Sequence, residues 1–143
     1  MSVTIDANVL VYASNEADPL HRPARALVER LAAGPGLVYL FWPVLLGYLR
    51  LVTHPAILPR PLAPSFAAEN VSSLLALEHV RSPGETEAFW GTYLRAAAGD
   101  TGGNLVPDAH LVALMHDHDV ATIYTRDRDF RRFDGIRPVD PFA

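Results

Sequence analysis

The segment that decides the fold is VTIDANVLVY, residues 3–12, in which Asp6 and Asn8 interrupt a run of strand-forming apolar side chains. The residues from Val3 to Ile5 predict a buried strand that ends at Asp6. A carboxylate at the end of an apolar strand needs a compensating partner, because burying an unpaired charge is costly. The partner of Asp6 has to come from the rest of the chain.

Further along the chain, short apolar runs alternate with segments of helical period. After a loop, helices are expected from Asp18-Pro19 to Gly34, from Pro43 to the residue before His54, from Pro64, from Glu85 to Ala98, from Pro107, and as a single turn in DFRRF, residues 129–133. Further strands are expected in LVYLFW (37–42), around Val80, in VATIYT (120–125) and in IRPV (136–139). This alternation predicts a single α/β domain over residues 1–143, with a mostly parallel sheet.

Two of the expected helices carry clear sets of candidate core residues. On the helix that Pro107 opens, the apolar face is Leu111, Val112, Leu114 and Met115. On the helix from Glu85 to Ala98, the residues expected to be buried are Phe89, Trp90, Tyr93 and Leu94. Apolar side chains that recur three and four residues apart line one face of a helix, which then packs on the core.

The charged residues exclude some classes of protein. The formal net charge is −4, which argues against a protein that coats nucleic acid, although Arg126, Arg128, Arg131 and Arg132 form a local basic cluster. Lysine is absent, so the 12 residues counted together as Lys and Arg are all Arg. Arg favours planar, bidentate contacts to carboxylates or phosphates.

The chain shows no sign of a membrane segment. The uncharged stretch from Leu31 to Leu49 is long enough to cross a bilayer, but Gly34-Pro35-Gly36 and Pro43 divide it into short pieces. Asp6 interrupts the N-terminal apolar run, so no signal peptide is expected. The absence of cysteine fits a reducing compartment. We therefore expect a cytoplasmic protein.

Three carboxylates occupy positions at which a site forms in an α/β fold. Asp6 ends the first strand, Asp127 follows the strand in residues 120–125, and Asp108 lies in the first turn of the helix that Pro107 opens. In an open parallel sheet, sites form beyond the carboxyl ends of the strands. If the first and penultimate strands are neighbours, these three carboxylates converge.

Each of these acids also has a purely structural explanation. Asp108 in a first turn interacts favourably with the helix dipole. Asp127 or Asp129 can cap the short helix that follows, and for Asp129 the cap is the preferred interpretation. Asp6 can accept backbone hydrogen bonds in an Asx-turn, with help from Asn8. Taken together, however, clustered carboxylates repel one another, and the pKa of at least one rises unless a cation lies among them.

A hard divalent metal ion would resolve this repulsion. Mg²⁺ prefers oxygen ligands and is typically held by one or two carboxylates while it keeps several waters. Such an ion lowers the pKa of a bound water and stabilises the charge that develops on a phosphate oxygen. The negative cluster repels a polyanion, so nearby arginines, of which Arg126 and Arg128 are candidates, would have to bind it.

The histidines near these acids are less informative. His110, on the helix of Asp108, is a candidate for substrate contact. His116 and His118 lie near the end of the same helix in MHDHD, residues 115–119. Two residues apart on a helix point to different faces, so no metal role is expected for this pair.

Three segments in order along the chain carry a more specific signal. They are DANVLVYA (6–13), NLVPDAHLVAL (104–114) and TRDRDFRRF (125–133). With these segments the chain resembles a PIN-domain ribonuclease of the kind that forms the toxin half of VapBC toxin–antitoxin pairs. LLGYLRLVTHPAILPRPLAP (45–64) and RPVDP (137–141) resemble one VapC subgroup. The resemblance covers nearly the whole chain.

The resemblance implies a PIN fold, a three-layer α/β/α arrangement with a parallel sheet, and Mg²⁺- or Mn²⁺-dependent cleavage of RNA. It matches Asp6, Asp108 and Asp127 to the metal-binding acids, and Asn8 and Thr125 to polar positions beside them. It also implies a homodimer and a small VapB antitoxin, which typically inserts a helix and a charged tail at the active site. We therefore expect an endoribonuclease toxin whose RNA contacts include Arg126, Arg128 and His110.

One position departs from the family pattern. The family usually places a Glu on the second helix, whereas here Gly47 takes that position and Pro43 to Thr53 contains no acid. Either a catalytic carboxylate is lost or another part of the chain supplies it. An alternative function is therefore a PIN-fold module that binds RNA or a partner without efficient catalysis.

A third hypothesis is a haloacid-dehalogenase-type phosphatase, which also begins with an Asp at the end of a first strand. That chemistry requires a second Asp two residues later as a general acid, together with a Lys. The chain has Asn8 at that position and contains no Lys. The sequence therefore favours the nuclease over the phosphatase.

Overall fold

A five-stranded parallel sheet forms the centre of the computed structural model, which describes residues 2–143. The strands are β1 (Ser2–Ile5), β2 (Leu37–Tyr39), β3 (Val80–Arg81), β4 (Thr122–Tyr124) and β5 (Arg137–Val139). They lie in the order β3-β2-β1-β4-β5, and every neighbouring pair is parallel. The expected parallel sheet is confirmed, and so is the expected pairing of the first and penultimate strands.

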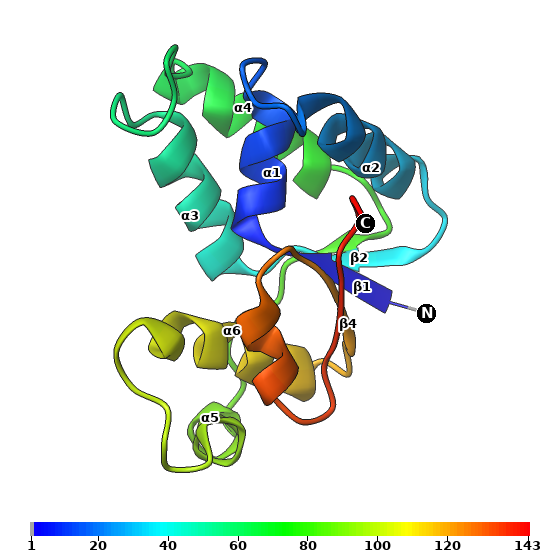
Figure 1. Ribbon diagram of the computed structural model, residues 1–143. Helices are drawn as coiled ribbons and strands as arrows, with labels where there is room; N and C mark the ends of the chain where they lie inside the picture. Colours follow the sequence, from blue (N-terminus) through cyan, green and yellow to red (C-terminus); the bar gives the residue numbers. More distant parts are fainter. Residues whose placement is uncertain (1) are drawn as a thin grey trace.

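Helices cover both faces of this sheet. The α-helices are α1 (Ala7–Ser14), α2 (His21–Ala33), α3 (Trp42–Val52), α4 (Pro64–Leu75), α5 (Phe89–Ala97) and α6 (Val106–Asp117), and the 3-10 helices are η1 (Gly103–Leu105) and η2 (Arg128–Arg132). Figure 1 shows α1 to α4 on one side of the sheet and α5, α6 and the orange η2 segment on the other. The predicted three-layer α/β/α architecture is therefore confirmed.

The helix α1 corrects the expectation of a loop after the first strand. Asp6 has extended backbone angles, with φ −76° and ψ 150°, and α1 begins at the next residue. Val9, Leu10 and Val11 are buried where α1 packs between α2 and α3. β-Branched side chains favour a strand locally, but tertiary packing overrides that preference. The strand-to-helix turn therefore places the Asp6 carboxylate at the edge of the sheet.

Two further helices begin later than the sequence predicts. Asp18 does not cap α2; its side chain accepts the N–H of Leu20 at 2.8 Å within the preceding turn. α5 begins at Phe89 rather than at Glu85. Such boundaries depend on turn geometry that periodicity does not report.

The core is confirmed on α6 but only partly on α5. All four residues predicted for the apolar face of α6 are buried. On α5, Phe89 and Tyr93 pack against the core, whereas Trp90 is 67% exposed and Leu94 is 52% exposed. The predicted burial of Trp90 and Leu94 is therefore wrong, because these two side chains lie on the solvent-exposed face of α5.

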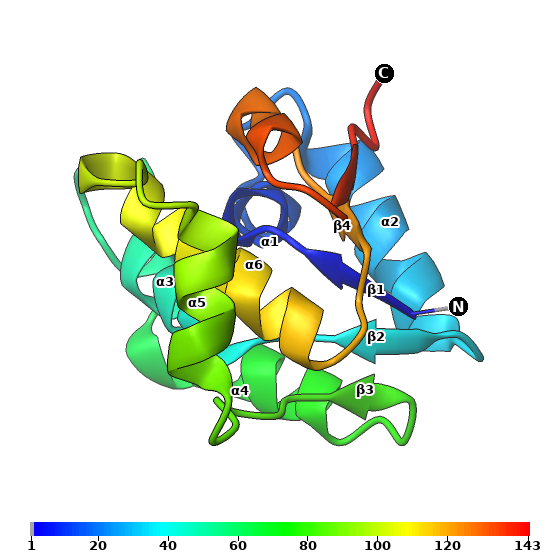
Figure 2. The same cartoon turned by 90° about the horizontal axis from the view of Figure 1, so that it is seen from below.

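The uncharged stretch from Leu31 to Leu49 is divided as its prolines and glycines predict. It contains the end of α2, all of β2 and most of α3. Figure 2, which views the molecule from below, shows β1 and β2 side by side in the sheet, with α2 behind them. Across residues 2–143, no helix combines the length and the apolar character that a membrane span requires.

Candidate metal centre

Four carboxylates gather at the carboxyl edge of the sheet. Asp6 follows β1, Asp127 and Asp129 follow β4, and Asp108 lies in the first turn of α6. Asp108, Asp127 and Asp129 each offer a carboxylate oxygen, and these oxygens lie within 4.8 Å of one another. The adjacent, parallel strands β1 and β4 bring Asp6 beside this group, because the backbone N–H of Asp6 donates to the carbonyl oxygen of Tyr124 at 2.9 Å.

Asp129 is the acid whose role sequence reasoning missed. The side chain that caps η2 is that of Asp127, whose Oδ1 accepts the N–H of Asp129 at 2.9 Å. The carboxylate of Asp129 is thereby left to join Asp108 and Asp127. The preferred interpretation of Asp129 as a cap is therefore wrong. The segment Asp127-Arg128-Asp129 does not by itself predict which acid caps η2, because either Asp can do so. The turn geometry decides it.

Asp6 lies outside the group of three but interacts with it electrostatically. Burial raises the pKa of the Asp6 carboxyl, and the charge of Asp127 adds to that effect. The hydrogen bond from Thr125 and the N–H groups of Ala7 and Asn8 act in the opposite direction. Asp6 is thus a partly buried carboxylate that receives hydrogen bonds from its own protein but takes part in neither of the ion pairs found within residues 2–143.

Asp108 carries the clearest mark of uncompensated negative charge. Burial, followed by the charges of Asp127, Asp6 and Asp129, raises the pKa of Asp108 to about 6. The predicted rise in the pKa of at least one clustered carboxyl is therefore confirmed. The ion pairs found within residues 2–143 are Arg25–Glu29 and His110–Glu85, and neither includes one of these four acids.

The polar residues beside the acids differ in their surroundings. Thr125 is buried, and its hydroxyl contacts Asp6 and Asp127. Asn8 is exposed in the first turn of α1. The structure therefore ties Thr125 directly to the carboxylates and leaves Asn8 facing solvent beside them.

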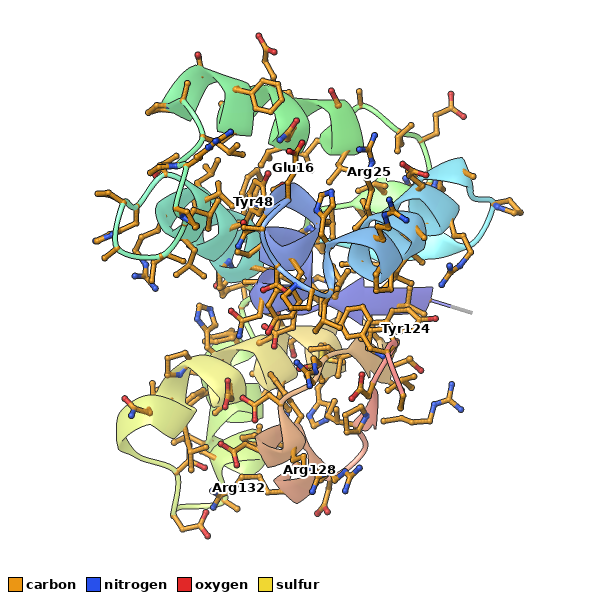
Figure 3. All side chains as sticks on the ribbon, turned by 45° about the horizontal axis from the view of Figure 1, so that its top comes forward. Glu16, Arg25, Tyr48, Tyr124, Arg128 and Arg132 are labelled. Carbon is orange, nitrogen blue, oxygen red and sulfur yellow. The ribbon has the colours of Figure 1, made fainter. Side chains whose placement is uncertain are left out.

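The candidate RNA-contacting residues also separate into two kinds. Arg126 and Arg128 are exposed next to Asp127. Arg131 and Arg132 are exposed on η2, and Figure 3 shows Arg128 and Arg132 on the same part of the molecule. His110 instead binds Glu85 through Nε2 at 2.8 Å and meets the ring of Phe89 edge-on. The arginines remain open to a polyanion, whereas His110 is engaged with the segment that leads into α5.

His116 and His118 bind backbone rather than each other. The Nε2 atom of His116 lies 3.0 Å from the carbonyl oxygen of Asp134, and that of His118 lies 3.0 Å from the carbonyl oxygen of Gly84. The ring of His118 also stacks near Tyr39 and Phe41. These contacts hold the loops at Gly84 and at Asp134 against the end of α6.

Gly47 occupies a place where a side chain would fit. A Cβ added there would meet the Cβ of Ala7 at 3.6 Å, which is ordinary van der Waals contact. Ala7 directly follows Asp6, so this position of α3 faces the start of α1 beside the acidic group. The absence of the Glu that the family usually has at this position therefore leaves space near the acids. The group of three carboxylates is made by Asp108, Asp127 and Asp129 instead.

The comparison with known families decides where the chain belongs. The model of the PIN domain matches residues 3–136. The chain belongs to the PIN-domain family. Ribonuclease VapC48 of Mycobacterium tuberculosis is 58% identical to this PIN domain over 144 residues, which cover 100% of the chain and 99% of the relative.

Solved structures agree with this fold. VapC20 of Mycobacterium tuberculosis, a toxin that cleaves the sarcin-ricin loop, matches this PIN domain with a TM-score of 0.65 at 21% identity, over 95% of this chain and 99% of that one. A toxin–antitoxin complex from Klebsiella pneumoniae matches with a TM-score of 0.60 at 17% identity, over 97% of both chains. At these identities the likeness concerns the fold.

The donor set of this PIN domain fits a hard divalent cation. Four carboxylates supply only oxygen ligands, which Mg²⁺ and Mn²⁺ prefer. Burial and the neighbouring carboxylates raise the pKa of Asp108, and neither ion pair found within residues 2–143 includes one of these acids. A bound cation would supply the missing positive charge.

Proposed function

We propose that this PIN domain is a Mg²⁺- or Mn²⁺-dependent endoribonuclease and the toxin of a VapBC pair. The observation that carries the proposal is the group of carboxylates at the carboxyl edge of the sheet, with no basic partner among the described residues. The 58% identity to a relative named as a ribonuclease supports the same function. Since RNA and the antitoxin are intracellular molecules, the proposed place of action is the cytoplasm.

The roles of the residues follow from their positions. Asp6, Asp108 and Asp127 would hold the cation, and Asp129 would join them. When bound, Mg²⁺ or Mn²⁺ would supply a water of lowered pKa and positive charge next to the phosphate. The exposed guanidinium groups of Arg126 and Arg128 would bind neighbouring phosphates of the RNA backbone. The carboxylate cluster would thus act on the phosphodiester that these arginines hold.

Cleavage of RNA by the purified, antitoxin-free protein tests this proposal. Total RNA is incubated with Mg²⁺, with Mn²⁺ or with EDTA, alongside the Asp6→Asn variant. Discrete products that need the metal and disappear in the variant are expected, and sequencing their ends would identify the target. Absence of cleavage with either metal, from protein shown to be folded, contradicts the proposal.

The second candidate function is a PIN-fold module that binds RNA or a partner with little catalysis. Gly47 favours it, since the usual carboxylate of the second helix is absent. The Gly47→Glu variant separates the two functions, with Gly91→Glu on α5 as a control for the change in helix propensity. If the protein is already a nuclease, Gly47→Glu should change its rate of RNA cleavage only modestly. If it is a binding module that lost catalysis with the Glu, it should gain cleavage in Gly47→Glu and not in Gly91→Glu.

The phosphatase hypothesis is not supported, because the chain belongs to the PIN-domain family.

An antitoxin helix is the partner that a groove lined by α1 to α4 fits. This groove, of about 1100 Å³, lies between α2 and α4, and apolar side chains of α1 to α4 line it, among them Leu10, Val28, Leu45 and Leu74. Charged side chains of both signs stand around these apolar residues, including Glu16 and Arg25, which Figure 3 shows in the same half of the molecule as Tyr48. An amphipathic helix matches an apolar floor with a charged rim. We therefore assign the groove to a helix of the VapB-like antitoxin.

Substitution of an exposed groove residue tests this assignment. Phe66 of α4 lines the groove and is 53% exposed, so Phe66→Asp should weaken antitoxin binding without unfolding the domain. Ile57 is 48% exposed but does not line the groove, and Ile57→Asp is the matched control. Equal antitoxin affinity of the two variants in a titration would contradict the assignment.

A homodimer completes the proposed function. Trp42 and Leu46 lie one turn apart on α3 and are 42% and 60% exposed, and Trp90 and Leu94 lie one turn apart on α5. In both Figure 1 and Figure 2, α3 and α5 lie toward the same end of the molecule, although they cover opposite faces of the sheet. Exposed large apolar residues of this kind mark an association surface. A second copy of the chain is the proposed occupant, because pairs of exposed apolar residues on two helices suit an isologous contact.

A further inference from the structure

Thr125 links the two strands that carry the candidate metal centre. It directly follows β4, is 2% exposed, and donates its backbone N–H to the carbonyl oxygen of Val139 at 3.0 Å. Its hydroxyl lies 2.8 Å from Oδ2 of Asp6 and 2.9 Å from the backbone nitrogen of Asp127. One buried oxygen atom therefore contacts two acids that come from opposite ends of the chain.

The direction of these two hydrogen bonds is fixed by the chemistry of the groups. The backbone N–H of Asp127 can only donate, so the oxygen of Thr125 must accept from it. A hydroxyl carries one proton, and that proton is then directed to the carboxylate of Asp6. The arrangement satisfies all three groups only when Asp6 accepts. The hydroxyl therefore fixes both the rotamer of Asp6 and the path of the backbone at Asp127.

The effect of this contact extends beyond Asp6. The backbone that Thr125 holds at Asp127 continues into the next hydrogen bond, in which Asp127 Oδ1 accepts the N–H of Asp129. A displacement at Thr125 therefore changes the positions of three of the four acids. Groups that hold metal ligands in place typically change metal affinity by about 10- to 100-fold when they are removed.

We propose that Thr125 is a positioning residue for the divalent cation. Its hydroxyl holds Asp6 and Asp127 in the relative position at which both can act as ligands. This role rests on the proposed metal-dependent function, and it goes further because it assigns the alignment of β1 and β4 ligands to a single hydroxyl. A merely structural Thr would affect stability but not the affinity for the cation in the folded protein.

The test compares four proteins by calorimetric titration with Mn²⁺ after removal of metal with EDTA. Thr125→Val removes the hydroxyl with little change in volume, and Thr125→Ser keeps it. Thr122→Val is the matched control, because Thr122 is a buried residue of β4 whose hydroxyl accepts a hydrogen bond from Arg137 at 2.9 Å and does not contact the acids. Thermal unfolding of each protein shows that it is folded at the temperature of the titration.

The expected result is a dissociation constant for Mn²⁺ that rises by about tenfold or more in Thr125→Val, while Thr125→Ser and Thr122→Val stay within about threefold of the wild type. If Thr125→Val does not fold, Thr125→Ala is titrated instead, since it also removes the hydroxyl, and the same loss is expected. Equal affinity of the wild type and the hydroxyl-free variant for Mn²⁺ overturns the positioning role. The role is also overturned if Thr125→Ser loses as much Mn²⁺ affinity as the hydroxyl-free variant does. Absence of Mn²⁺ binding by the wild type overturns the proposed metal dependence itself.

Discussion

Asp108 shows how a site residue affects stability and function in opposite directions. It lies in the first turn of α6, where its charge favours the helix dipole, yet burial and three neighbouring carboxylates oppose that charge. The second effect dominates, because the pKa of Asp108 rises to about 6 rather than falling. At the scale of single residues, the clustered acids of this PIN domain therefore reduce the stability of the metal-free protein.

The first prediction concerns Asp108→Asn in the absence of metal. The pKa of Asp108 is raised from 3.8 to about 6, so between these values the folded state binds a proton that the unfolded state has released. Stability therefore falls as the pH rises through this window. The variant should gain about 1 to 2 kcal/mol in the free energy of unfolding at about pH 8 and nothing at about pH 4, after allowance for solvent screening.

Urea unfolding in EDTA at both pH values measures this difference. Added Mn²⁺ should reverse it, because a cation bound by the folded wild type stabilises that protein more than the variant. Identical stability of the two metal-free proteins at the higher pH would show that the negative charge is already compensated.

The second prediction concerns Asp129. Because its carboxylate oxygen lies within 4.8 Å of those of Asp108 and Asp127, Asp129→Asn should weaken Mn²⁺ binding by about tenfold, as expected for loss of a charged oxygen ligand. Asp134→Asn, an exposed residue just beyond η2, is the matched control and should bind Mn²⁺ like the wild type. Equal affinities of the two variants for Mn²⁺ would show that Asp129 is a surface charge with no role in metal binding.

The short helix η2 is the element on which the site depends most. It contains Asp129 and follows Asp127, and its single buried residue, Phe130, is 1% exposed and packs near Phe133. A 3-10 helix of five residues has little stability of its own. The position of these two acids is therefore maintained by one aromatic anchor and by the hydrogen bonds at Thr125 and Asp127.

The third prediction tests this anchor. Phe130→Ala should lower the free energy of unfolding by about 3 to 5 kcal/mol, the usual cost of removing a buried Phe side chain. Phe130→Leu is the control, which should lose less than about 2 kcal/mol and retain Mn²⁺ binding. Urea unfolding and Mn²⁺ titration give both quantities, and a small loss in Phe130→Ala would mean that other contacts hold η2.

Elements also show where sequence reasoning succeeds and where it fails. The sheet, the helix that carries Asp108 and the convergence of Asp6, Asp108 and Asp127 at one edge could be predicted, because strand alternation and Pro107 define them locally. Helix α1 could not, since its valines favour a strand until α2 and α3 pack against them. The role of Asp129 could not either, because the choice between two possible caps depends on one hydrogen bond.

At the scale of the whole molecule, the two faces of the sheet have different tasks. The layer of α1 to α4 holds the groove assigned to the antitoxin, and the opposite layer provides Asp108 on α6 and the arginines of η2 (Figure 1). Asp6 belongs to neither layer, because it lies at the turn between the central strand and α1. A partner in the groove and an RNA at the carboxylates can therefore bind different sides of one molecule.

The fourth prediction concerns association. Leu46→Asp places a charge among the exposed apolar residues of α3 and α5 and should convert a dimer into a monomer in solution. Ile57→Asp changes a similarly exposed residue beyond α3 and should leave the dimer intact. Size-exclusion chromatography with light scattering measures both masses, and a wild type that is monomeric at all concentrations would remove the basis for the proposed dimer.

The position of β1 at the centre of the sheet has a consequence for synthesis. Asp6 is made long before its neighbour β4 and before the remaining acids, which lie at residues 108, 127 and 129. The candidate centre cannot assemble until β4 has been made, because that strand leads to Asp127 and Asp129. A chain whose synthesis stops before residue 108 therefore contains only Asp6 of the four acids. The residues that line the groove assigned to the antitoxin fall between 10 and 74, so all of them are made before Asp108.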